Sequence, residues 1–324
     1  MPTVKELLDS NEPRKIKAGL NYLSEKGKLG DLKSAMAFIR QGNKEISSCA
    51  VKASGNIVKR NLISYFGSLD ENTKNKLAGL LKKLDPGIIK NISADLYSEN
   101  EEYRFRALQV LGLLGQDAAI KKTISDMLLD KNEKMRATSI SLMRTMVNSN
   151  DLEIILKVLK DDDPRVRANG IETLENLGNV NTAGILMKFK RDPNNRVRGN
   201  VLKALWNLGQ RDIIQDLKIM LEDRKNPLMP VSAAWVIGET AEQGDKGLIH
   251  LLSDYTLEED ALLIENIAKA FLKIGGKGSV CYLEHLIPPE ITSDACIFMK
   301  KMNLTIRAIP PSAAKILKAE GWTQ

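Results

Sequence analysis

The chain has 324 residues, a formal net charge of +7 and only 5% aromatic residues. It has no run of about 18 consecutive apolar residues, which excludes a transmembrane helix, and its first residues lack the pattern of a secretion signal. The two histidines and three cysteines are scattered without metal-ligand spacing, which argues against a metal centre and favours a reducing compartment. We expect a cytoplasmic bacterial protein without a cofactor.

The first third of the chain holds nearly all of the positive excess. Residues 1–100 contain 17 Lys or Arg and 11 Asp or Glu, whereas residues 101–324 contain 31 and 30. Helical apolar spacing is degenerate here, with weak copies near residues 14–23, at Ile46 and at Thr73. One interpretation is a surface for an anionic partner such as nucleic acid, and the other is a solvated face that keeps the chain soluble. The candidate anionic-partner patch is Lys52, Lys76, Lys83 and Arg106.

The middle of the chain is an internal repeat. The segment that starts at Val166-Arg167 returns 31 residues later at Val197-Arg198, with apolar or small residues zero, four, five, eight and eleven positions from each anchor. These positions share one side of a helix, and a second apolar stretch of helical period precedes each anchor. A fixed period of this length predicts stacked helix pairs. The anchors are Tyr103, Met135, Val166, Val197, Met229 and Leu263, with a weaker copy at Ile291.

The predicted architecture is one continuous all-α solenoid over residues 1–324, with about nine or ten helical-hairpin repeats. Residues 1–100 form its basic, degenerate part and residues 101–290 its regular part. Residues 291–324 form a C-terminal cap, in which a short helix ending at Trp322 covers the open end of the apolar core. Leu174 and Leu205, eight positions after their anchors, are expected to be buried.

The repeated phrase Asp161-Asp162-Asp163-Pro164-Arg165-Val166-Arg167, followed by Leu177-Gly178, resembles HEAT repeats in the compact bacterial form related to phycocyanobilin-lyase repeats. The resemblance implies a right-handed solenoid whose second helices line the concave side. It also implies a structural ladder, in which an Asp and an Arg six residues apart bond to the next repeat. The ladder residues are Asp130, Arg136, Asp161, Arg167, Asp192 and Arg198.

Positions three, six and ten of each second helix project away from the predicted core, so we expect them to face the concave groove. Armadillo-type solenoids use rows of Asn there to hold an extended peptide, and an Asn amide both donates and accepts hydrogen bonds. The alternative is that these asparagines cap helices or link neighbouring repeats. The candidate partner-binding residues are Asn169, Asn176, Asn200, Lys203, Asn207, Trp235 and Glu239, and the same stripe includes Glu172, Ser232 and Asn266.

The sequence shows no catalytic motif, such as a nucleophile turn or a phosphate-binding loop. We therefore predict a non-catalytic scaffold or adaptor that binds a protein segment in the concave groove. The alternative is a nucleic-acid-binding HEAT-like protein, either resembling DNA glycosylases, for which Trp235 and Glu239 stand one turn apart, or binding through a basic groove.

Overall fold

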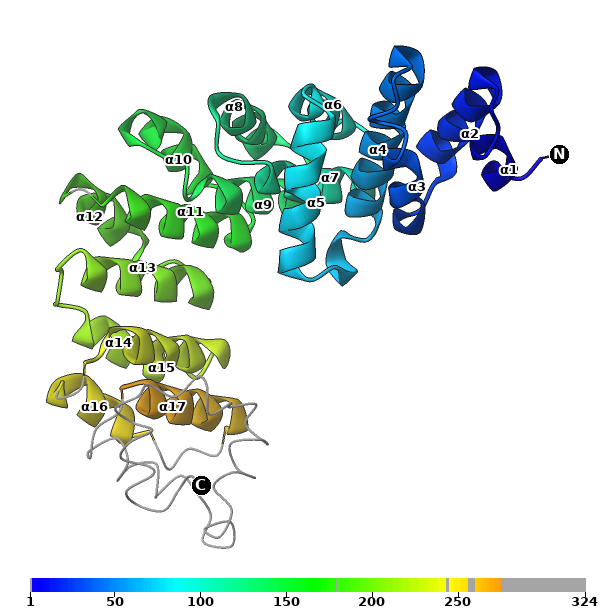
Figure 1. The fold of residues 1–324 in the computed structure, drawn as a ribbon. Helices are drawn as coiled ribbons and strands as arrows, with labels where there is room; N and C mark the ends of the chain where they lie inside the picture. The colour runs from blue at the N-terminus through cyan, green and yellow to red at the C-terminus, as the bar shows by residue number, and fades with distance from the viewer. Residues whose placement is uncertain (1, 179, 243–244, 256–259, 275–324) are drawn as a thin grey trace, which may run out of the picture. The chain divides into compact units, whose positions relative to one another are not determined.

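A computed structural model describes residues 2–178, 180–242, 245–255 and 260–274 (Figure 1). This part of the chain contains α-helices and short 3-10 helices and no β-strand. It divides into two compact units, residues 1–146 (unit 1) and the residues from Val147 onward (unit 2). The expected repeat at Ile291 and the expected cap with Trp322 lie outside the described residues.

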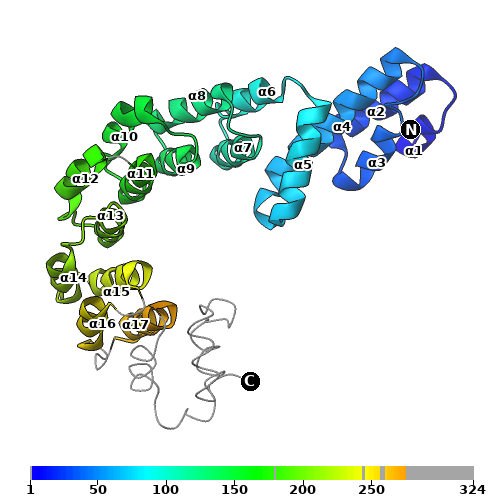
Figure 2. The same cartoon turned by 60° about the vertical axis from the view of Figure 1, so that its left-hand side comes forward.

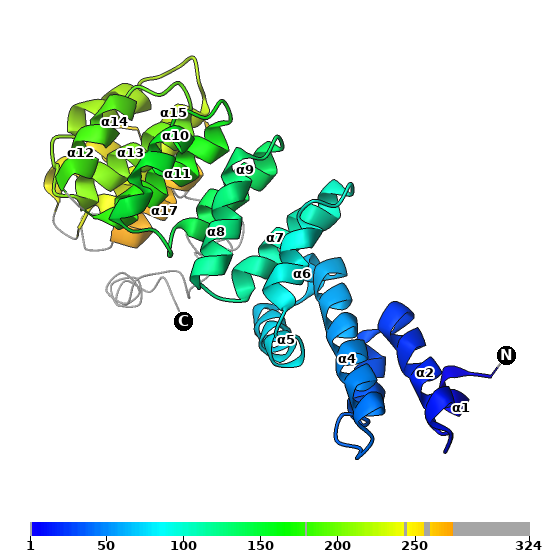
Figure 3. The same ribbon diagram turned by 90° about the horizontal axis from the view of Figure 1, so that it is seen from above.

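Unit 1 consists of helix pairs whose second helices contact one another in chain order. The pairs are α1 with α2, α3 with α4, α6 with α7 and α8 with α9. Their second helices follow the order α2, α4, α7 and α9, and Figure 3 shows α2 and α4 side by side. The helices are α1 (Val4–Leu8), α2 (Pro13–Lys26), α3 (Leu32–Met36), α4 (Lys44–Ser64), α5 (Glu71–Leu84), α6 (Ile88–Asp95), α7 (Glu101–Leu113), α8 (Ala118–Asp126) and α9 (Glu133–Met143).

Helix α5 is an insertion between two pairs. It follows α4 after only the 3-10 turn Phe66–Ser68, and α4 still contacts α7 directly while α5 packs against both. Thr73 therefore lies at the start of a helix, as expected, but this helix is not the second helix of a repeat. The apolar spacing could not reveal this, because any helix buried on one side, here through Ala78 and Leu81, has the same period.

Unit 2 repeats the paired arrangement without an insertion. Figure 2 shows α11, α13, α15 and α17 in one layer and α12, α14 and α16 in the other, and each helix of the first layer contacts the next one. We call this first layer the second-helix layer. The helices are α10 (Leu152–Val158), α11 (Pro164–Leu177), α12 (Val180–Leu186), α13 (Asn195–Asn207), α14 (Ile214–Leu221), α15 (Leu228–Thr240), α16 (Lys246–Ser253) and α17 (Ala261–Ile274).

The second helices begin one or two residues before each of the six main anchors, which confirms the predicted register. In five of these helices an Asn or Asp three residues before the anchor accepts the anchor's backbone N–H, as Asp163 does from Val166 and Asn194 from Val197, whereas α15 begins after Pro227 without such a side-chain cap. Such N-caps satisfy donors that have no partner within the helix. Helix α11 is followed by its C-cap Gly178, whose φ of 63° favours glycine.

The apolar core lies between the layers and between successive repeats. Leu174 and Leu205 are fully buried, as predicted, and so are the anchors Val166 and Val197. Each second helix therefore buries its apolar side against its own first helix and the flanking repeats.

We expect Leu174→Ala or Leu205→Ala to lower the free energy of unfolding by about 2–5 kcal/mol, because each leaves a cavity in a closed core. Urea unfolding followed by circular dichroism measures the change. Ile219→Ala is the matched control, since Ile219 of α14 is about half exposed and its truncation should have little effect. Equal stability of the core variants and the control would contradict this register.

Candidate protein-binding site

A hollow of about 400 Å³ opens on the second-helix layer of unit 2. Its walls come from all four helices of that layer, α11, α13, α15 and α17. Five of its lining residues belong to the stripe predicted to face the groove. The lining residues are Glu172, Asn195, Arg196, Gly199, Asn200, Val231, Ser232, Trp235 and Asn266.

Trp235 forms the aromatic part of this hollow. Its neighbours Ala234 and Val236 are fully buried, so the indole lies on the opposite side of α15, where it is 37% exposed. Opposite it on α13, Gly199 has no side chain, and a Cβ there would lie 3.5 Å from Val236 Cγ2. Helix α13 therefore lies within van der Waals reach of α15 at Gly199.

Asn200 is the most deeply buried polar residue of the hollow, at 5% exposure. Its Nδ2 donates to Ala168 O at 3.2 Å and to Glu172 Oε1 at 2.8 Å, both on α11. Asn200 thus links two neighbouring repeats, as the alternative interpretation of the asparagines expected. The same side chain also lines the hollow.

The other predicted partner-binding residues lie on the same layer but outside the hollow. Lys203 forms an ion pair with Glu175 at 3.0 Å, and Asn207 donates to Glu175 Oε1 at 2.6 Å. Glu239 pairs with Lys273 at 2.5 Å, while Asn169 Oδ1 accepts from Arg196 Nη2 at 3.1 Å. Asn176 is exposed near the end of α11. Around the hollow, opposite charges are therefore joined between neighbouring helices.

Four lining residues were missed from the sequence: Asn195, Arg196, Gly199 and Val231. The register contained the signal, because the missed residues lie two and one positions before an anchor and two positions after it, on the same broad helical face as positions three and six. The predicted stripe used only positions three, six and ten, and so omitted the side of that face nearest the helix start.

The expected ladder residues meet at the turns within the helix pairs. Arg167 donates to both carboxylate oxygens of Asp192 in the next repeat, each at 3.0 Å, and to Asp161 O at 2.8 Å. In unit 1, Arg104 pairs with Asp130 of the next repeat through one nitrogen and donates from Nε to Leu96 O, and Arg136 donates to Asp130 O. These contacts are the arrangement that the resemblance implies, and their structural role remains a prediction.

The next arginine of the ladder in unit 2, Arg198, is bonded less fully than Arg167. The Nε of Arg198 is buried and has no hydrogen-bond partner among the described residues. Hydrogen bonds from the backbone N–H groups of Asn226 and Lys225 lower the pKa of Asp223, and the charge of Arg198 lowers it further. The geometry of the ladder therefore varies from repeat to repeat.

We expect Arg167→Met to lower the free energy of unfolding by about 3 kcal/mol, because it leaves Asp192, only 8% exposed, as a buried charge without its partner. Thermal unfolding measures the loss. Arg165→Met, which removes an exposed cation, should change stability by less than about 1 kcal/mol. If Arg167→Met instead kept its melting temperature and lost a partner, the structural interpretation of the ladder would be wrong.

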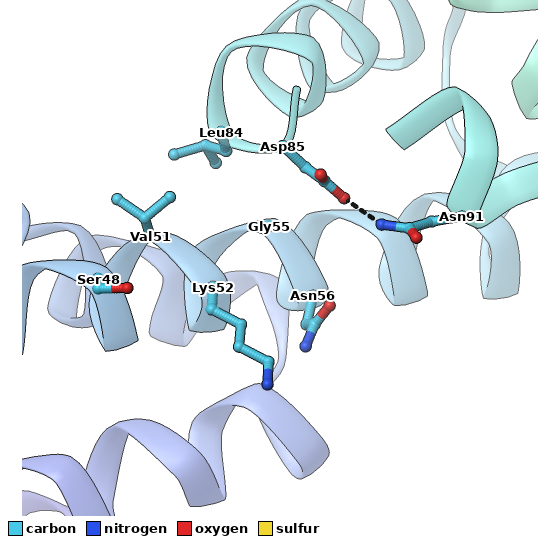
Figure 4. Close-up of a pocket in the computed structure, with 8 residues that line it drawn as sticks. All are labelled: Ser48, Val51, Lys52, Gly55, Asn56, Leu84, Asp85 and Asn91. Atoms are coloured by element: carbon cyan, nitrogen blue, oxygen red, sulfur yellow. Dashed lines mark hydrogen bonds between the residues drawn. The ribbon is translucent and has the colours of Figure 1, made fainter. Parts of the chain in front are cut away.

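Unit 1 contains a second hollow, of about 480 Å³, between α4, the end of α5 and α6 (Figure 4). Asp85 stands in its wall and accepts from Asn91 Nδ2 at 2.8 Å and from the Gly87 N–H at 2.9 Å. Lys52 lines the same hollow and has no ion pair with a described residue. The fixed carboxylate makes this hollow a poor receptor for an anion.

The residues of the candidate anionic-partner patch differ in whether they already have an internal partner. Lys76 and Lys83 lie exposed on the inserted helix α5 and form no ion pair with a described residue. Arg106 lies on α7 and is held by Glu102 at 2.7 Å and by Ser64 O. Lys76 and Lys83 are therefore available to an external anion, whereas Arg106 already has internal partners.

Tyr103 has a strongly shifted pKa but lines neither hollow. Burial first, and then the charge and hydrogen bond of Asp95, raise the pKa of Tyr103 to about 12. Asp95 also binds Lys59 at 2.9 Å, so this cluster links α4, α6 and α7. Among the described residues, no group of three or more His, Cys, Asp or Glu side chains could hold a metal ion.

Stacked helix pairs of this kind define an α-solenoid repeat protein. The family model of HEAT repeats matches residues 152–238. Residues 152–238 accordingly form HEAT repeats, and this segment carries every lining residue of the unit 2 hollow except Asn266. No helix in the described ranges combines the length and apolarity needed to cross a bilayer.

Solved structures agree with this fold. The karyopherin Kap121p bound to the SUMO protease Ulp1p is similar with a TM-score of 0.52 and 12% identity, over 99% of this chain and 43% of that one. Kap121p alone gives 0.50 and 13%, over 98% and 42%, so this chain spans less than half of the karyopherin. At these identities the likeness shows the fold alone.

Human deoxyhypusine hydroxylase, solved in complex with glycerol, is a weaker match. Its TM-score is 0.34 with 16% identity, over 66% of this chain and 95% of that one. A search among curated proteins gives no match to this sequence.

Proposed function

We propose that this chain is a non-catalytic scaffold that binds an extended segment of another protein across the second-helix layer of unit 2. The observation that carries the proposal is the hollow, which combines the exposed Trp235 with polar side chains from three other helices. Exposed tryptophan inside a polar rim is the residue type that most often anchors an interface.

The charges around the hollow favour an uncharged segment. Lys203 and Glu239 are each held in an ion pair with a neighbouring helix, and Glu172 stands 3.8 Å from Arg196. Because these charges are matched internally, they offer little to a charged partner, and affinity should come from packing on Trp235 and from hydrogen bonds. The proposal is supported by the similar fold of the karyopherin Kap121p, which was crystallised bound to the SUMO protease Ulp1p.

We expect Trp235→Ala to weaken binding of a peptide selected on the full chain from a random display library by about 2 kcal/mol or more, or about thirtyfold in Kd. Fluorescence anisotropy of the labelled peptide measures Kd, which should change little between 50 and 300 mM salt. Ile219→Ala, on the opposite helix layer, is the control and should bind normally. Peptides that bind Trp235→Ala as tightly as the original chain would contradict the proposal.

A second candidate function is nucleic-acid binding by unit 1. It rests on Lys76 and Lys83, which are exposed on α5 without an ion pair to a described residue, on a helix whose only acidic residue, Glu71, already binds Lys74. A surface of this kind attracts phosphates by charge alone.

If this second function holds, the double variant Lys76→Glu/Lys83→Glu should abolish binding of a 20-base-pair duplex, and the affinity of the original chain should fall steeply with salt as counterions are released. Electrophoretic mobility shifts at several salt concentrations measure both effects. The control is Lys33→Glu/Lys90→Glu, which reverses two other exposed lysines of unit 1. Tight, salt-sensitive duplex binding that survives Trp235→Ala would favour this function over the first.

A further inference from the structure

One polar group that lines the hollow of unit 2, the side-chain amide of Asn200, is held in place by hydrogen bonds to a neighbouring helix. Both hydrogens of the Asn200 amide are used, one by Ala168 O and one by Glu172 Oε1. Because a carbonyl and a carboxylate can only accept, these two bonds also fix which end of the amide is nitrogen. The Oδ1 of Asn200 has no partner in the described part of the chain, and Asn200 lines the hollow.

This oxygen differs from the other polar atoms around it. Ser232, Asn266 and Arg196 are at least partly exposed, so they can rotate or keep water when a ligand arrives. Asn200 is 5% exposed and its Nδ2 is held by two bonds, so its amide cannot rotate toward another partner. A partner that covers the hollow removes solvent from Oδ1, and a buried acceptor left without a donor costs about 1–3 kcal/mol.

We infer that the bound segment places a backbone N–H on Asn200 Oδ1 and lays the adjoining side chain against Trp235. This inference rests on the proposed function and specifies how the segment is recognised. Asn200 acts there as an acceptor alone, so it selects for N–H groups and against proline at that position.

The charges of the lining explain why the donor is a neutral backbone group. Arg196 lines the hollow beside Glu172, so a lysine or arginine side chain would meet a cation that already serves this carboxylate. An acidic side chain would bring acceptor oxygens toward Asn200 Oδ1, which needs a donor. An extended peptide avoids both conflicts, because it presents N–H groups while successive side chains point to opposite faces.

The test changes the ligand and leaves the protein intact. The probe is the peptide selected on the full chain whose binding depends on Trp235, remade with each backbone amide in turn replaced by an ester, which removes one N–H without adding bulk. We expect one ester position, next to the residue that contacts Trp235, to weaken binding about tenfold or more. Esters at the flanking positions should have smaller effects.

A variant of the chain then assigns this effect to Asn200. In Asn200→Ala the acceptor is absent, so the sensitive ester and the parent amide should bind with nearly equal Kd. The ratio of the two constants is an internal comparison within one protein, and it stays valid when the variant is less stable. Asn207→Ala, which changes an Asn outside the hollow, is the matched control and should keep the tenfold ratio.

The outcomes separate this inference from the function on which it rests. Trp235-dependent binding with a flat ester scan, or an ester effect that persists in Asn200→Ala, overturns the role of Asn200 and leaves the proposed function standing. A library that yields no peptide sensitive to Trp235→Ala overturns both. An ester effect that disappears only in Asn200→Ala supports the inference.

Discussion

A single helix pair of this chain cannot bury its own apolar side, and the whole structure depends on that constraint. Leu174 and Leu205 reach complete burial because a neighbouring repeat covers each second helix. Stability in such a stack is a sum of terms within repeats and terms between nearest neighbours. The contacts between successive second helices therefore form much of the core of unit 2, and they also hold together the helices that line its candidate site.

Polar side chains also form contacts between adjacent repeats. Arg167 reaches Asp192 at the turn edge, while Asn200 reaches α11 on the opposite side of the second helix. Each bond joins a residue to one in the adjacent repeat, and we expect the two together to limit how far neighbouring helices slide or rotate. The walls of the hollow beside Trp235 come from helices that are joined in this way.

The sequence predicted the regular part of this architecture well, and the reason is local. Most anchor positions follow from an N-cap three residues earlier and from apolar spacing within one helix, and both are readable without tertiary information. The outward position of Trp235 follows from the same register. The insertion of α5 and the burial of Asn200 could not be predicted in this way. The first depends on which helix packs against α7, and the second on how closely Glu172 and Ala168 of the preceding repeat approach.

Helix α5 carries a consequence for how chains of this kind can change in length. Because α4 contacts α7 directly, the stack continues past the insertion without a break, and α5 adds surface without adding a repeat. Such a position can gain or lose a segment over evolutionary time while the register on either side is preserved, and loops that tolerate insertion are where proteins commonly acquire new surfaces. The junction between α4 and α6 is thus a natural grafting point, where new binding surface can be added to the scaffold independently of the site in unit 2.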